Sequence, residues 1–283
     1  MTPVAIVTDS ASDLPPDLAA ALGIRVVPLL VRFGTQEFRA GVDLSAADFW
    51  TRMLAPDAPF PTTAAPSPGA FAAAFEKAFA DGAQSIVCVT IGSRLSGTFA
   101  SAEMGAKEHA GREIHVVDST SASMGVGHLA MLGVELAAVG RPAADVAATL
   151  RDRAADLDIF VTVDTLDYLR KGGRLSPARA AIGTMLSVKP IITVVEGLVE
   201  TAERVRTQAR ARERVTELLA GRPVERLAIL HTGVADVEAF RRTVVERIPG
   251  GVDPARVSIQ TIGPSIGPHV GPGALGGVVL LRR

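Results

Sequence analysis

The first half of the chain alternates short β-rich runs with Ala-rich helical segments, and this alternation restricts the fold more than any other feature. The runs VAIVTD (residues 4–9), SIVCVT (85–90) and EIHVVD (113–118) are separated by helical segments such as AFAAAFEKAFA (70–80). Such alternation predicts crossover units and a mostly parallel sheet with helices on its faces. We therefore expect an N-terminal three-layer α/β domain.

The pattern changes near residue 156. From there the chain reads as strands and helices in a different order, with VERLAIL (224–230), DVEAFRRTVVERI (236–248), RVSIQTIG (256–263) and GALGGVVLLRR (273–283). We expect residues 1–155 to form the parallel-sheet domain and residues 156–283 to form a smaller two-layer α+β domain. Apolar residues make up 48% of the chain and charged residues 21%, which is typical of folded globular proteins.

Charge and composition argue against several classes of function. The formal net charge is −1, with an acidic excess in residues 1–155 and a basic excess in residues 156–283. Aromatic residues are only 4% of the chain, so a nucleic-acid surface built on base stacking is not expected. The start MTPVAIVTDSAS does not resemble a signal peptide, and Cys88 has no second cysteine to pair with. We expect a cytoplasmic protein.

Polar residues follow three of the predicted strands, in VTDSASD, IGSRLSGT and VDSTSAS. Ligands of parallel sheets bind at the carboxyl ends of the strands. The stretch IGSRLSGTFASA (91–102) places Ser93, Ser96 and Thr98 where a strand gives way to a helix. Such hydroxyls can cap the helix, act as a nucleophile, or hold an anion together with helix-start N–H groups at Gly97 and Thr98.

Common catalytic and cofactor motifs are missing. The sequence has no G-x-S-x-G nucleophile elbow, no Walker phosphate loop and no histidine spacing typical of a metal site. GVGHLA (125–130) does not follow its strand directly, so it indicates helix packing rather than a dinucleotide turn. A hydrolase triad of Ser96, His269 and Asp9 stays open as the enzymatic alternative. No metal and no cofactor are expected.

Seven stretches, in order along the whole chain, resemble the DegV family of fatty-acid-binding proteins. They are VTDSASDLP, PTTAAPSPGAF, IGSRLSGTFASA, VVDSTSASMGVG, TLDYLRKGGRLS, KPIITVVEG and GPSIGPHVGPGALG. The resemblance implies two α/β domains with a long-chain fatty acid buried between them, and no catalytic activity. It assigns the carboxylate to Thr63 and Ser96, and it offers Arg206 as a further candidate. His269, in a Gly/Pro-rich loop, is expected near the same group.

This chain departs from the family pattern at two places near the expected carboxylate. Ala64 and Ala65 stand where the family commonly has Ser-Gln, and Gly92 stands where it often has Ser. Both differences remove polar side chains. The sequence therefore offers fewer polar side chains for the carboxylate than the family pattern does.

The resemblance also implies a protein partner, a separate fatty acid kinase that phosphorylates the bound carboxylate. The basic segment YLRKGGRLSPAR contains Arg170, Lys171, Arg174 and Arg179. Arg174 is the residue that the resemblance assigns to kinase docking, and the positive charge also suits a transient visit to an anionic membrane surface. The alternative is a solvated basic loop. We expect a monomer that does not bind nucleic acid.

Overall fold

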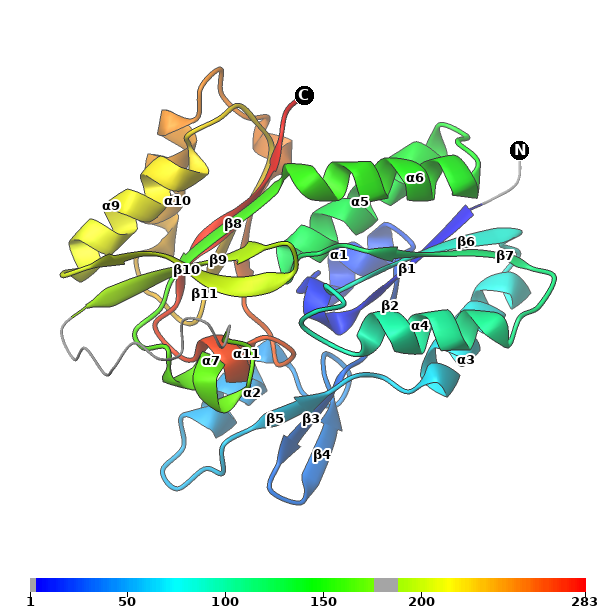
Figure 1. The fold of residues 1–283 in the computed structure, drawn as a ribbon, viewed down its shortest axis with the longest axis horizontal. Helices are drawn as coiled ribbons and strands as arrows, with labels where there is room; N and C mark the ends of the chain where they lie inside the picture. The colour runs from blue at the N-terminus through cyan, green and yellow to red at the C-terminus, as the bar shows by residue number, and fades with distance from the viewer. Residues whose placement is uncertain (1–3, 176–187) are drawn as a thin grey trace.

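Two sheets, each built from one half of the sequence, form the framework of the protein (Figure 1). The computed structural model describes residues 4–175 and 188–283. The first sheet is entirely parallel and has the order β2 (Arg25–Val27), β1 (Val4–Asp9), β6 (Ser85–Thr90), β7 (Glu113–Asp118). The predicted α/β class and the N-terminal parallel sheet are confirmed.

Helices cover both faces of the first sheet. All six residues of β6 are buried, as expected for a strand enclosed on two sides. One face packs against α3 (Pro68–Ala80) and α4 (Thr98–Lys107), and the other against α5 (Met124–Ala138) and α6 (Ala143–Arg153). Ser67 accepts a hydrogen bond from Ala70 N and Pro68 occupies the first turn of α3, so the predicted start of this helix is confirmed.

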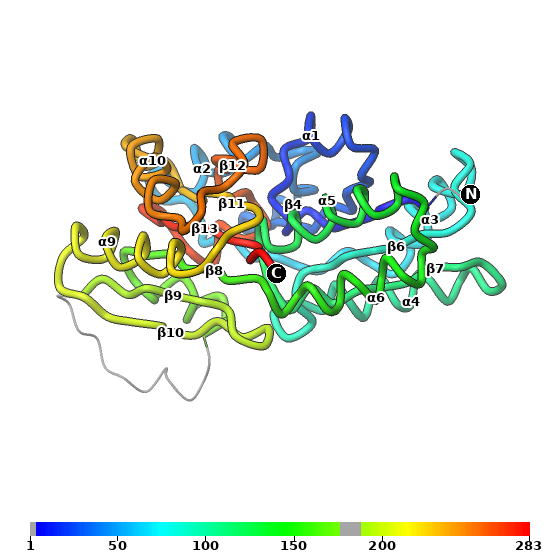
Figure 2. Tube along the Cα trace, turned by 90° about the horizontal axis from the view of Figure 1, so that it is seen from above, coloured from blue at the N-terminus to red at the C-terminus, as the bar shows by residue number. Residues whose placement is uncertain are grey.

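The second sheet is mixed. Its order is β10 (Leu198–Val205), β9 (Lys189–Val195), β8 (Leu157–Thr162), β13 (Leu275–Leu281), β11 (Val224–His231), β12 (Val257–Thr261). Helices α9 (Gln208–Leu219) and α10 (Val237–Arg247) pack against this sheet, and α5 of the first half contacts β8 and β13. Seen from above, the helices of the second half and the first sheet lie toward opposite ends of the molecule (Figure 2).

A small antiparallel sheet, which the sequence pattern did not predict, extends from the first half. It has the order β4 (Gln36–Arg39), β3 (Leu30–Phe33), β5 (Thr62–Ala64) and packs with α2 (Ala46–Met53) around a core of its own that includes Phe49 and Trp50. The Trp50 indole N–H donates to Ile262 O at 2.9 Å. The small sheet is thereby tied to the second half of the chain.

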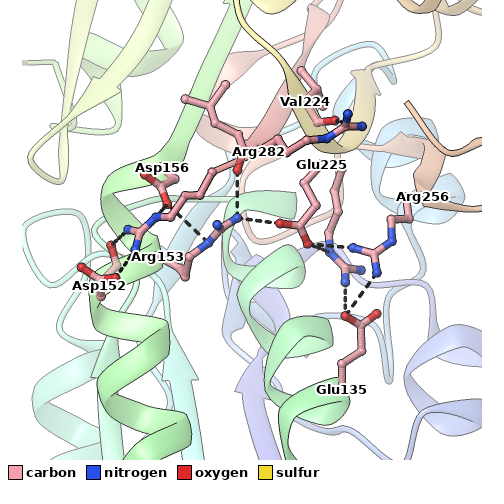
Figure 3. A network of polar contacts seen from close by, with 11 residues as sticks. Glu135, Asp152, Arg153, Asp156, Val224, Glu225, Arg256 and Arg282 are labelled. Atoms are coloured by element: carbon pink, nitrogen blue, oxygen red, sulfur yellow. Dashed lines mark hydrogen bonds and ion pairs between the residues drawn. The ribbon is translucent and has the colours of Figure 1, made fainter. Parts of the chain in front are cut away.

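An ionic network joins the two halves on another side of the molecule (Figure 3). Glu135 of α5 pairs with Arg226 of β11 and with Arg256. Arg153 of α6 donates to Glu225 at 2.8 Å and to Leu281 O at 2.9 Å. Because Arg226 is only 2% exposed, removing one partner would leave a charge poorly compensated in the interior.

The remaining short elements lie mostly in connections. They are η1 (Ser10–Ser12), α1 (Pro16–Ala21), η2 (Ala154–Asp156), α7 (Asp167–Lys171), η3 (Pro254–Arg256) and α11 (Gly267–Val270). Among residues 4–175 and 188–283, no helix is long and apolar enough to cross a membrane. The same residues contain no group of three or more His, Cys, Asp or Glu side chains placed to hold a metal ion.

Candidate functional site

A largely apolar pocket lies between the two halves of the chain. The empty space between its lining atoms, including open solvent at its mouth, is about 740 Å³. The first half contributes residues that follow β6 and β7, and the second half contributes one face of the mixed sheet. The apolar walls include Ile91, Ile159, Val161, Ile192, Leu230 and Ile262.

Thr63 and His269 meet at the pocket wall. Thr63 Oγ1 lies 2.9 Å from His269 Nε2, and both residues line the pocket. Burial, together with the positive charge of Arg174, lowers the pKa of His269 to about 4, so the ring is neutral near pH 7. His269 Nδ1 is buried and has no hydrogen-bond partner among the described residues. When the ring carries its proton on Nε2, this N–H donates to Thr63 Oγ1, and the Thr63 hydroxyl proton is free to donate to a ligand.

Ser96 also lines the pocket, in the loop between β6 and α4. Its Oγ lies 2.8 Å from Thr98 Oγ1 and accepts a long hydrogen bond of 3.4 Å from Thr98 N. Thr98 is fully buried. When the Thr98 hydroxyl donates to Ser96 Oγ, the Ser96 proton is free to donate to a ligand.

Arg174 lies in the pocket wall and not on a free surface loop. Its Nε donates to Leu95 O at 3.2 Å, and its side chain also donates to Gly172 O. Arg174 lines the pocket together with Ser96 and His269. A guanidinium has five N–H donors, so two backbone contacts leave donors for an anion. The sequence interpretation had placed this residue with the partner surface.

Other candidates from the sequence lie outside the pocket lining. Ser93 is exposed and its N–H donates to Asp118, Gly97 is exposed at the start of α4, and Arg206 is exposed beyond the end of β10. Arg170 is exposed and paired with Asp167, while Lys171 Nζ lies 5.4 Å from the centre of the Phe60 ring. Arg179 lies outside the described residues.

One of the two departures from the family pattern, Gly92, has a local explanation. A Cβ atom at Gly92 would lie 3.2 Å from the backbone of Thr120 and 3.3 Å from that of Ser121, so the residue packs closely against the neighbouring loop. Ala65 lies beside Gly97: a Cβ atom added to Gly97 would lie 3.9 Å from the Cβ of Ala65. Besides Thr63 and Ser96, the polar lining of the pocket includes Arg174 and His269 of the second half.

The contacts of a hydrolase triad are not formed. Asp9 is fully buried, and its two carboxylate oxygens accept the N–H groups of Ala11 and Ile91, both at 2.8 Å. His269 Nε2 is engaged by Thr63, and Ser96 by Thr98. Burial raises the pKa of Asp9 to about 6. The geometry instead suits non-covalent binding of a molecule with one anionic end and one apolar end.

Sequence reasoning missed part of this site. It did not place Arg174 in the pocket, and it did not single out Ser123 or Ser265, which also line it. The GGR spacing around Arg174 was visible, but a charged loop is usually solvated, so that signal favoured the surface. Only the packing of the second half against the first brings these side chains to one cavity.

Comparison with known proteins agrees with the fold. A family model described as "Uncharacterised protein, DegV family" matches residues 3–282. The chain belongs to the DegV family. A DegV domain-containing protein of Streptomyces coelicolor is 36% identical over 284 residues, and the match covers 99% of each chain. One from Mycobacterium tuberculosis is 38% identical over 281 residues, covering 96% of this chain and 95% of the relative.

Solved structures of DegV proteins are also similar. A DegV family protein from Thermus thermophilus, described by its fatty acid binding, superposes with a TM-score of 0.89 at 35% identity, covering 99% of this chain and 100% of that one. A stearic acid-binding protein from Eubacterium ventriosum gives a TM-score of 0.86 at 26% identity, with 99% and 98% covered. Fatty acid binding is therefore found among the structural neighbours of this DegV chain.

Proposed function

We propose that this protein binds a long-chain fatty acid in the pocket between its halves and presents the carboxylate to a separate fatty acid kinase, without being an enzyme itself. The observation that carries the proposal is the composition of the pocket. Apolar side chains from both halves line most of it, while Thr63, Ser96, Arg174 and His269 supply hydrogen-bond donors and a cation. Fatty acid binding by DegV proteins of similar structure supports it.

The acyl chain and the carboxylate contribute in different ways. Burial of each CH₂ group contributes about 0.8 kcal/mol, so the tail supplies most of the affinity. The hydroxyls of Thr63 and Ser96 orient the carboxylate, and Arg174 balances its charge. A neutral His269 acts through Thr63 and adds no second charge to the site. The arrangement suits a ligand that must be both held and released.

The experiment that tests binding is native mass spectrometry of the protein purified without detergent or added lipid, followed by titration of delipidated protein with palmitic, stearic and oleic acids. We expect a co-purified fatty acid or tight binding of an added one. The alcohol of the same chain length is the control, because it keeps the tail and lacks the charge. Protein that carries no fatty acid and binds none would refute the proposal.

The kinase step rests on the family resemblance and on the position of two cations. Arg170 and Lys171 are exposed on α7, and Arg174 follows this helix in the pocket wall. Lys171→Ala should leave fatty-acid binding unchanged and slow phosphorylation by the cognate kinase, with a smaller effect at high salt because salt screens exposed charges. Lys107→Ala is the control, because Lys107 is an exposed cation at the end of α4. Equal phosphorylation of wild type and Lys171→Ala at every salt concentration would remove α7 from the docking surface.

A further inference from the structure

A short segment behind the pocket makes polar contacts that the carboxylate site does not use. It runs from Asp9, the last residue of β1, to Asp13, and is called the DSASD segment after its sequence. In the described part of the chain, none of its residues belongs to the pocket lining. Its side chains form hydrogen bonds with residues of four separate segments that line the pocket.

Most residues that form hydrogen bonds with the side chains of the DSASD segment line the pocket. Asp9 Oδ2 accepts from Ile91 N, and Ser10 Oγ accepts from Leu29 N, both at 2.8 Å. Ser10 Oγ also lies 2.8 Å from Ser265 Oγ, and Ser123 Oγ donates to Asp13 Oδ2 at 2.6 Å. The lining residues held in this way are Leu29, Ile91, Ser123 and Ser265.

Asp13 connects the two halves of the chain at this place. Its second oxygen, Oδ1, accepts from Gly263 N at 3.0 Å, at the start of the segment that contains Ser265 and leads into α11 with His269. A Cβ atom on Gly263 would lie 2.9 Å from the same oxygen, so the loop approaches Asp13 with its bare backbone. One carboxyl group thus holds both the loop and the start of α5.

Ser123 shows that this contact overrides local preference. It occupies the N-cap position of α5 with φ of 51° and ψ of −139°, a strained conformation for a residue other than glycine. A serine at this position usually accepts a hydrogen bond from the helix backbone, but Ser123 makes no such cap. Its hydroxyl goes to Asp13 instead, and this contact compensates part of the strain.

We infer that the DSASD segment sets the shape of the acyl pocket from behind, with Ser10 and Asp13 as positioning residues that determine which acyl chains fit. The inference rests on the proposed function, since it concerns the selectivity of the same pocket. Close-packed walls respond to small shifts of backbone, and a pocket that gains or loses the space of one methylene changes discrimination by about tenfold or more. Loss of Asp13 frees two wall segments at once.

Asp13 is inferred to position the pocket wall through its hydrogen bonds and not through its charge. Its direct partners, Ser123 of α5 and Gly263 of the loop, are neutral, and the charged group acting on it is Asp9 from the end of β1. Burial raises the pKa of Asp13 to about 7. An asparagine can still accept from Gly263 N and can donate to Ser123 Oγ, so Asp13→Asn keeps the contacts and removes the charge.

The test measures dissociation constants for myristic, palmitic, stearic and oleic acids. In Asp13→Ala we expect the ratio of affinities between these acids to change by about tenfold, because the pocket wall is displaced. Asp13→Asn should keep the wild-type ratio. Ser10→Ala, which frees Leu29 and Ser265, tests the same idea if Asp13→Ala does not fold. Phe75→Leu is the control, since it destabilises a separate core cluster away from the pocket.

The outcomes are distinct. An unchanged ratio in Asp13→Ala and Ser10→Ala, or equal weakening for all four acids, would overturn the inference and leave these residues a purely structural role. An Asp13→Asn protein as altered as Asp13→Ala would also overturn it, because charge would then be the cause. A wild-type protein that binds none of the acids would contradict the proposed function instead.

Discussion

Thr63 Oγ1 and His269 Nε2 lie 2.9 Å apart although the two residues are separated by 206 positions in the chain. Thr63 belongs to strand β5 of the small antiparallel sheet, and His269 belongs to the short helix α11 of the second half. The pair closes one wall of the pocket. Binding of a carboxylate at this wall therefore depends on how the two halves pack.

Removal of either pocket hydroxyl should weaken fatty-acid binding. Thr63→Val and Ser96→Ala each remove one hydrogen bond to a charged group, so we expect losses of about 1.5 to 3 kcal/mol in binding free energy. Isothermal titration calorimetry with oleic acid measures the change. Ser93→Ala is the matched control, because Ser93 is exposed and outside the pocket lining. Unchanged affinity in both pocket variants would place the carboxylate elsewhere.

Arg174→Ala should also weaken binding, because it removes the cation from the pocket wall. The expected loss is about 1.5 to 3 kcal/mol for the acid and much less for the alcohol of the same length, which carries no charge. Isothermal titration calorimetry with the acid and with the alcohol measures the two losses separately. Arg206→Ala is the control, since Arg206 is exposed. If Arg174→Ala binds the acid normally and only phosphorylation is slowed, Arg174 acts on the kinase, as the sequence interpretation had it.

The protonation of His269 gives an acid-side pH dependence. The pKa of His269 is lowered to about 4 by burial, with a further contribution from Arg174, so the folded protein resists protonation of this ring. Its contribution to stability is therefore present above the ordinary pKa of histidine, 6.5, and is lost as the pH falls toward 4. Urea unfolding between pH 7 and 4.5 should show a smaller loss in His269→Gln than in wild type. If the free energy of unfolding falls equally with pH in the two proteins, His269 does not have a lowered pKa in the folded protein.

Asp13 gives the opposite pH dependence. Burial raises its pKa from 3.8 to about 7, so its contribution to stability is fully present below pH 3.8 and is lost as the pH rises through 7. Each unit of pKa difference corresponds to about 1.4 kcal/mol. Asp13→Asn, which is neutral at every pH, should gain stability relative to wild type between pH 5 and 8 in denaturant unfolding.

The control for Asp13→Asn is Asp17→Asn, because Asp17 is exposed in the first turn of α1. Asp9, which is fully buried and whose pKa is raised to about 6, remains in both proteins, so some pH dependence persists. A stability difference between Asp13→Asn and wild type that is the same at pH 5 and pH 8 would show that Asp13 does not titrate in this range.

Much of the framework follows from local patterns in the sequence. The apolar run SIVCVT becomes the buried inner strand β6, and Ser67 and Pro68 begin α3 as predicted. The polar stretches after β1, β6 and β7 all lie at or behind the pocket, because parallel strands bring their carboxyl ends to one edge of the sheet. These features depend on residues close together in the chain or on the regular geometry of a parallel sheet.

Other features arise only when distant segments pack. Arg174 has the local pattern of a solvated loop residue, yet its contact with Leu95 O places it in the pocket. Ser123 has the local pattern of a helix cap, yet its hydroxyl binds Asp13. A polar side chain takes the partner that leaves the fewest buried groups unsatisfied, and that partner lies across the junction between the two halves. The parallel sheet and the placement of hydroxyls after its strands could therefore be predicted from periodicity and spacing, whereas the order of the strands and the pairing of polar side chains across the pocket required the tertiary structure.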